Sequence, residues 1–151
     1  MSLIPADKLS LLIEQKASMD NWELLIEMTG AAISKGLKDE EKRYKLKLAY
    51  EELISNIIRS AEENEGKNTI LKISCGSSEL DGNKLFTLQT EDNGVPFDPG
   101  FNTEDSVDTE QHISEREIGG LGIFLIKQSV DLANYEWSNG TNKNQISMRT
   151  E

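Results

Sequence analysis

The sequence predicts a single α+β domain, a two-layer sandwich in which helices pack on a sheet. The chain has 151 residues, a length that suits one hydrophobic core. Apolar residues recur at three- and four-residue steps in the first half, whereas much of the second half alternates apolar and polar residues. No internal repeat or linker divides the chain, so we expect residues 4–151 to form the domain. Residues 1–3 contribute to none of these patterns, and we expect them to be a cloning leader.

The first half is expected to hold a short strand followed by two helices. The apolar run in residues 8–15 favours a strand. Apolar residues spaced for one helix face predict a helix over residues 20–34, with Gly36 as its C-terminal stop. Asp39 can cap a second helix that runs to about Glu63 and has a broad apolar face.

After Gly66 the pattern begins to alternate, which indicates strands. Two hairpins are expected, because Asp81-Gly82-Asn83 and Asn139-Gly140 supply turn residues. The strands are predicted at residues 69–77 and 84–91 in the first hairpin, and at residues 135–138 and 145–150 in the second.

Between these hairpins the chain is first irregular and then helical. Residues 93–119 are mostly polar with almost no periodicity, and a segment of that length is too long for a plain connection. We expect it to be either disordered or a functional lid. Residues 121–132 return to a helical pattern.

Composition narrows the compartment and the partners. The 16 basic and 27 acidic residues leave a net charge of −11, which repels nucleic-acid phosphates and anionic membranes and favours basic partners. We therefore expect no nucleic-acid or membrane binding. Cys75 is alone in the chain, so no intrachain disulfide is expected. The sequence has neither a signal-peptide core nor a transmembrane run, so the cytoplasm is the expected location.

A first polar motif lies on the second predicted helix. Glu52 and Asn56 are four residues apart, a step that stacks two side chains on one helix face. A carboxylate and a carboxamide oxygen are hard ligands that suit Mg²⁺. Glu52 can alternatively take a proton from a hydroxyl or a water. The plainer interpretation is a solvated helix flank, because Glu is a common exposed helix former.

A second motif follows the strand predicted at residues 84–91. Asp92 can accept a hydrogen bond from an exocyclic amino group such as that of adenine, and Gly94 lets a flat ring approach the backbone. A simple turn is the alternative, since Asn93-Gly94 is a strong turn dipeptide.

A third motif, Gly119-Gly120-Leu121-Gly122, opens a predicted helix. Glycines permit close approach, and the unpaired amides of a helix start form an anion site for which phosphate is the obvious occupant. The alternative is a flexible hinge.

In this order the three motifs resemble the nucleotide-binding boxes of the GHKL ATPases, which include gyrase, a heat-shock chaperone, histidine kinases and a DNA-mismatch protein. The chain most resembles the bacterial anti-sigma-factor kinases, and the resemblance runs from Ile4 to Arg149. It is carried by residues 51–59, 93–98 and 120–127. The resemblance implies a GHKL (Bergerat) sandwich: a mixed, mostly antiparallel sheet covered on one face by helices, with ATP held between a helix and a lid.

The resemblance also implies roles for single residues. Glu52 would be the general base, Asn56 a Mg²⁺ ligand and Asp92 the residue that reads adenine. Arg116 is the candidate lid cation near phosphate, with exposed charge balancing as its alternative. The remaining residues expected at the nucleotide are Gly94, Phe97, Gly119, Gly120, Leu121 and Gly122, and the ATP lid is expected at about residues 100–118.

Anti-sigma-factor kinases phosphorylate a small antagonist protein and otherwise hold a sigma factor, commonly as homodimers. The resemblance therefore implies a Mg²⁺- and ATP-dependent serine/threonine kinase with these partners, acting in transcription regulation. Such kinases often have His eight residues after the box Glu, where this chain has Ser60. A hydroxyl neither carries positive charge nor relays a proton near neutral pH as imidazole does. A noncatalytic module, in which nucleotide orders the lid and changes partner affinity, is the alternative.

Overall fold

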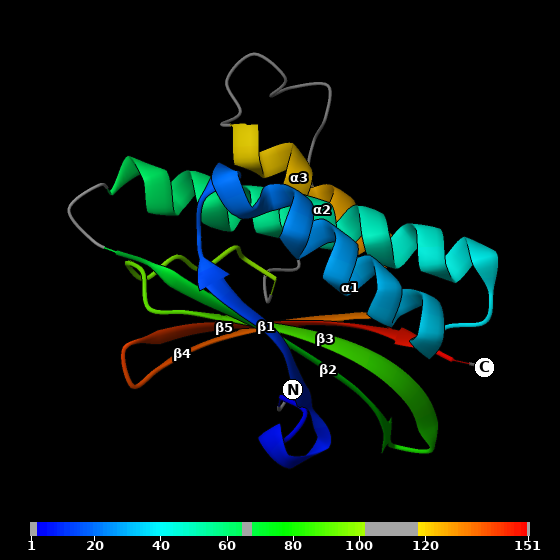
Figure 1. Ribbon diagram of the computed structural model, residues 1–151. Helices are drawn as coiled ribbons and strands as arrows, with labels where there is room; N and C mark the ends of the chain where they lie inside the picture. Colours follow the sequence, from blue (N-terminus) through cyan, green and yellow to red (C-terminus); the bar gives the residue numbers. More distant parts are fainter. Residues whose placement is uncertain (1–2, 65–67, 102–117, 151) are drawn as a thin grey trace, which may run out of the picture.

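The computed structural model describes residues 3–64, 68–101 and 118–150. In this part of the chain, three α-helices cover one face of a five-stranded sheet (Figure 1). The helices and strands, in chain order, are β1 (Ser10–Lys16), α1 (Trp22–Gly36), α2 (Glu40–Glu63), β2 (Ile70–Leu80), β3 (Asn83–Asp92), α3 (Ile118–Ser129), β4 (Leu132–Ser138) and β5 (Thr141–Arg149). Short 3-10 helices, η1 (Ala6–Lys8) and η2 (Met19–Asn21), flank β1. The predicted two-layer α+β sandwich is confirmed.

The strand order is β1-β2-β3-β5-β4. Each neighbouring pair of the described strands is antiparallel, so the sheet that we expected to be mixed contains no parallel pair in this part of the chain. Both hairpins close through two-residue turns with positive φ: 51° and 81° at Asp81-Gly82, 52° and 73° at Asn139-Gly140. These left-handed conformations match the right-handed twist of the strands, which is why Asp-Gly and Asn-Gly are favoured there.

Several predicted boundaries differ from the structure, and the largest differences lie in the last third of the chain. Helix α3 begins at Ile118, not at residue 121, and ends at Ser129, not at residue 132. Strand β4 begins at Leu132, not at residue 135, and β5 runs from Thr141 to Arg149, not from residue 145 to 150. Both strands are longer than expected, because cross-strand pairing continues from Leu132 opposite Ser147 to Ser138 opposite Thr141.

The cap of α2 and the end of α1 have different physical causes. The Asp39 carboxylate accepts hydrogen bonds from the amides of Glu41 and Lys42, which confirms the predicted cap. Gly36 is the last residue of α1, but no left-handed cap follows, because Leu37 is extended at φ −123° and ψ 128°. A Cβ on Gly36 would collide with the ring of Phe86. Glycine therefore serves a close approach of helix and sheet at this position.

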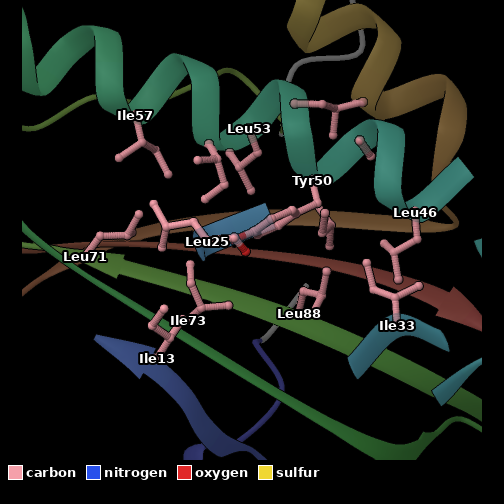
Figure 2. Close-up of a cluster of buried hydrophobic side chains, with 14 of the residues drawn as sticks. Ile13, Leu25, Ile33, Leu46, Tyr50, Leu53, Ile57, Leu71, Ile73 and Leu88 are labelled. Carbon is pink, nitrogen blue, oxygen red and sulfur yellow. The ribbon is translucent and has the colours of Figure 1, made fainter. Parts of the chain in front are cut away.

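The core lies between the helices and the sheet (Figure 2). Leu25, Ile33 and Tyr50 from the helices pack towards Ile73 and Leu88 of the strands, and all are buried. The Tyr50 hydroxyl accepts a hydrogen bond from Thr29 Oγ1 at 2.9 Å and donates one to the Leu25 carbonyl at 3.1 Å, so this phenol is paired inside the core.

On the helix-facing side of the sheet, one end is polar. Leu88 opposes Ile146, but the next two pairs on this side are Thr90 with Asn144 and Asp92 with Asn142. Side chains two residues apart on a strand share a face, so this polar end lies under the same helix layer as the core.

The N-terminal segment lies on the opposite side of the sheet (Figure 1). There the main chain of Ile4 donates to Gln145 Oε1 at 2.7 Å and accepts from Gln145 Nε2 at 3.0 Å. Among the described helices, none has the length and apolar character needed to cross a membrane.

Candidate functional site

Helices α2 and α3 bring the first and third motifs together. Glu52 and Asn56 share one face of α2, as predicted, and this face meets Gly122 of α3. A Cβ on Gly122 would stand 2.7 Å from Glu52 Oε2 and 3.5 Å from Asn56 Nδ2. Glu52 is therefore not a plain solvated flank, since its carboxylate packs against the glycine-rich helix.

Asn56 is 3% exposed and only half satisfied. Its Oδ1 accepts a hydrogen bond from Arg59 Nη1 at 3.2 Å, whereas its Nδ2 has no partner among the described residues. A half-turn of the carboxamide would exchange the two atoms and bring the oxygen to the side of Glu52 and Gly122.

Such an arrangement fits Mg²⁺. In the part of the chain that the structure describes, no three His, Cys, Asp or Glu side chains gather as a metal cluster. Mg²⁺ does not need one, because it is usually held by one or two protein oxygens with waters and substrate phosphates. Asn56, with Glu52 beside it, can supply those one or two protein oxygens.

The second motif sits where β3 ends. The Asp92 side chain is 6% exposed, and its Oδ1 accepts hydrogen bonds from the Gly94 amide at 3.0 Å and from Asn142 Nδ2 at 2.9 Å. A Cβ on Gly94 would stand 3.0 Å from Asp92 Oδ1 and 3.3 Å from Thr69 Cγ2. Glycine thus keeps the loop close to the carboxylate and to the neighbouring chain.

Asn142 of β5 organises this loop, and the sequence analysis did not identify it. Its Nδ2 donates to Asp92 Oδ1 and to the Val95 carbonyl, both at 2.9 Å. Its Oδ1 accepts from the Phe97 amide at 3.0 Å and from the Tyr135 hydroxyl at 2.6 Å. All four hydrogen-bonding positions of the carboxamide are used. The position of Asn142 just after the Asn-Gly turn was visible in the sequence, but its pairing opposite Asp92 was not.

Tyr135 is held in its protonated form. Partial burial raises the pKa of Tyr135, the negative charges of Asp98 and Asp92 raise it further, and a hydrogen bond from the Phe97 amide opposes them. The neutral phenol can therefore keep donating to Asn142.

A narrow cavity of about 20 Å³ lies between α2 and this polar end of the sheet. Its lining comes from α2, the chain before β2, the Asp92 loop and β5: Ile57, Ser60, Ala61, Asn64, Thr69, Asp92, Gly94, Val95, Phe97, Asn142 and Asn144. Ser60 faces this cavity two helical turns from Glu52, about 12 Å along α2 at the usual rise per residue. Phe97, 41% exposed, forms part of the lining. All three motifs thus adjoin a single helix, α2.

The backbone of the third motif is helical. Gly119, Gly120 and Leu121 lie in the first turn of α3, which confirms that the glycines open a helix, and Gly122 follows them. Amides of a first turn lack intrahelical partners and can bind an anion. Phe101, where the expected lid begins, is buried in the core. Arg116 and the other expected lid residues between 102 and 117 lie outside the described residues.

Comparison with known proteins identifies the family of the chain. A family model described as the histidine kinase-like ATPase domain matches residues 16–150. No curated protein sequence matched the chain. The family match covers most of the chain, and the fold has the sheet and helix layers expected of this type. The chain belongs to the histidine kinase-like ATPase family, the ATP-binding domains of the GHKL superfamily.

Proposed function

We propose that this protein is an ATP-dependent serine/threonine kinase of the anti-sigma-factor type. The observation that carries the proposal is the contact between the Glu52 carboxylate and Gly122 near the start of α3. It supports the proposal, because a carboxylate that can act as a base lies beside a helix whose first turn can hold phosphate. Phosphoryl transfer depends chiefly on positioning and electrostatic stabilisation, and a residue that accepts the proton of the attacking hydroxyl completes the site.

Each motif then has one task. Asp92 accepts a hydrogen bond from the adenine amino group, and the amides at the start of α3 hold phosphate oxygens. Asn56 holds Mg²⁺, which neutralises charge on the phosphates when bound. Glu52 takes the proton from the serine or threonine hydroxyl of the acceptor as that oxygen attacks the terminal phosphorus of ATP. The bond from this phosphorus to the β-phosphate oxygen breaks, and ADP leaves.

The proposed acceptor is a small antagonist protein, and the proposed second partner is a sigma factor held by a homodimer of this chain. These partners follow from the resemblance to anti-sigma-factor kinases. The net charge of −11 supports partners with basic binding surfaces.

The test is phosphoryl transfer. The protein is incubated with Mg²⁺ and ATP labelled in the terminal phosphate, together with candidate antagonists encoded next to it. Phosphoserine or phosphothreonine on an antagonist, lost in Glu52→Gln, is the expected result. ATP binding without transfer to any of these antagonists would contradict the kinase proposal.

A noncatalytic nucleotide switch is the second candidate, and the contact between Arg59 and Asn56 favours it. Because the Asn56 oxygen already accepts from Arg59, Mg²⁺ binding there must break or rearrange that hydrogen bond. Nucleotide binding would then be coupled to a change at the surface of α2. A switch predicts different partner affinities in ATP and ADP with no phosphate transferred, whereas a kinase predicts modified antagonist.

A further inference from the structure

Next to the pair of Asp92 and Asn142, the helix-facing side of the sheet carries a second polar pair, which is buried. Thr90 of β3 and Asn144 of β5 lie directly opposite each other, with exposed fractions of 0% and 3%. They share the helix-facing side with Asp92 and Asn142, one pair further along the strands.

Neither side chain of this pair is satisfied. Thr90 Oγ1 and Asn144 Oδ1 have no hydrogen-bond partner within the described ranges. On the opposite face, by contrast, the cross-strand pair Thr87 and Ser147 bonds to itself at 2.7 Å. Buried polar groups are nearly always hydrogen-bonded, so a buried acceptor without a partner indicates a missing donor.

The missing donor can be located, because Asn144 lines the same cavity as Asp92. The amino group of adenine carries two hydrogens. If Asp92 accepts one of them, the second needs another acceptor, and a buried amide oxygen in the same cavity provides it.

We propose that Asn144 is a specificity-determining residue of the base pocket and that its Oδ1 accepts a hydrogen bond from the adenine amino group. The inference rests on the proposed function, in that it takes the base to lie beside Asp92. It adds a second, neutral acceptor to the carboxylate and makes the pocket select bases that present an amino group at this edge.

The test compares ATP with the purine nucleoside triphosphate that has hydrogen in place of the 6-amino group. Asn144→Val removes the acceptor and keeps a residue that suits a strand. Asn134→Val is the matched control, because Asn134 lies opposite Gln145 on the other face of the sheet. Affinities come from titration calorimetry on the full chain.

In Asn144→Val we expect ATP affinity to fall about 3- to 10-fold, the effect of one neutral hydrogen bond. Affinity for the 6-hydrogen analogue stays unchanged, so the preference for ATP over the analogue shrinks. The melting temperature without nucleotide is equal to or above that of the wild type, because the variant buries no unpaired acceptor. Asn134→Val keeps the wild-type preference.

Three results would overturn the inference. Equal ATP affinity in Asn144→Val and wild type would show that Asn144 plays no part in base recognition, although the protein binds ATP. Equal losses for both nucleotides with a lower melting temperature assign Asn144 a structural role, such as a bond to Thr90. A wild-type protein that binds neither nucleotide would refute the proposed function as well. This result differs from the first two, in which wild type still binds ATP and only the inference about Asn144 fails.

Discussion

Glu52 of α2 and Gly122 of α3 approach so closely that a Cβ on residue 122 would stand 2.7 Å from Glu52 Oε2. The approach is possible because glycine has no side chain. The atom that would be displaced is the end of a flexible side chain, so the fold can tolerate a methyl group here while the carboxylate moves.

Gly122→Ala is therefore expected to preserve the stability of the fold but to slow phosphoryl transfer. Alanine favours a helix interior over glycine by about 1 kcal/mol, which offsets the local crowding. The shifted carboxylate would slow phosphoryl transfer by up to about 100-fold, the effect of a 1 Å misplacement. Thermal unfolding and single-turnover transfer measure the two quantities.

Gly30→Ala on α1 is the matched control. A Cβ there would meet only Lys47 Cε, at an ordinary 3.8 Å. It should raise stability slightly and leave transfer unchanged. A Gly122→Ala variant that transfers phosphate at the wild-type rate would show that the position of Glu52 does not matter.

Asp92→Asn is expected to weaken ATP binding and preserve the fold. The asparagine oxygen can still accept from the Gly94 amide and from Asn142, but the new amide group presents a donor where adenine also presents one. Loss of a hydrogen bond to a charged acceptor, worth about 1.5–3 kcal/mol, predicts roughly 10- to 150-fold weaker binding.

Calorimetry with ATP measures this loss. Asp98→Asn serves as the control, because Asp98 is exposed and its Oδ1 accepts from the Gly100 amide. Unchanged ATP affinity in a folded Asp92→Asn protein would rule out the adenine assignment.

Asn142→Ala should damage the same pocket indirectly. The change leaves the Phe97 amide and the Val95 carbonyl without their side-chain partner. We expect a loss of about 1–3 kcal/mol in the free energy of unfolding, the range for an unsatisfied buried group, together with weaker ATP binding. Tyr135→Phe removes only one of the four hydrogen bonds of the Asn142 carboxamide. It should therefore have a smaller effect on the free energy of unfolding and on ATP affinity. Chemical denaturation and calorimetry measure these two quantities in both variants. A larger effect in Tyr135→Phe than in Asn142→Ala would contradict the prediction.

Local features of this fold were predictable because their causes are local. The Asp39 cap and the Asn139-Gly140 turn depend on residues that are adjacent in the chain. The pairing of Glu52 with Asn56 likewise follows from helical spacing alone.

Features that depend on packing between elements were not predictable. Asn142 meets Asp92 because β5, rather than β4, lies beside β3, and the sequence does not reveal that order. Gly122 was expected at phosphate through the resemblance, but its contact with Glu52 depends on how α3 crosses α2. The end of α1 at Gly36 was predicted, but the close approach to Phe86 that requires glycine there was not, since Phe86 lies 50 residues further along the chain.

Glu52→Gln and Asn56→Ala should fail in different ways, although the two residues are neighbours on α2. Glutamine keeps the size of Glu52 but removes the proposed base, so ATP affinity should stay within several-fold of wild type while transfer falls by at least ~100-fold. Alanine at residue 56 removes the metal-directed oxygen and also releases Arg59, so the dependence of ATP affinity on Mg²⁺ should disappear.

Both outcomes come from ATP titrations with and without Mg²⁺ and from single-turnover transfer to the antagonist. Glu51→Gln is the matched control for the first variant, since Glu51 precedes Glu52 on α2 but lines a separate groove between α1 and α2. It should behave as wild type. If Glu52→Gln transfers phosphate as fast as wild type, Glu52 is not the base; if Asn56→Ala keeps the Mg²⁺ dependence, the metal ligand lies elsewhere. A wild-type protein that binds Mg²⁺ and ATP but modifies no tested antagonist would favour the nucleotide switch. Ser60 would then be the first position at which to introduce the histidine that anti-sigma-factor kinases often have there.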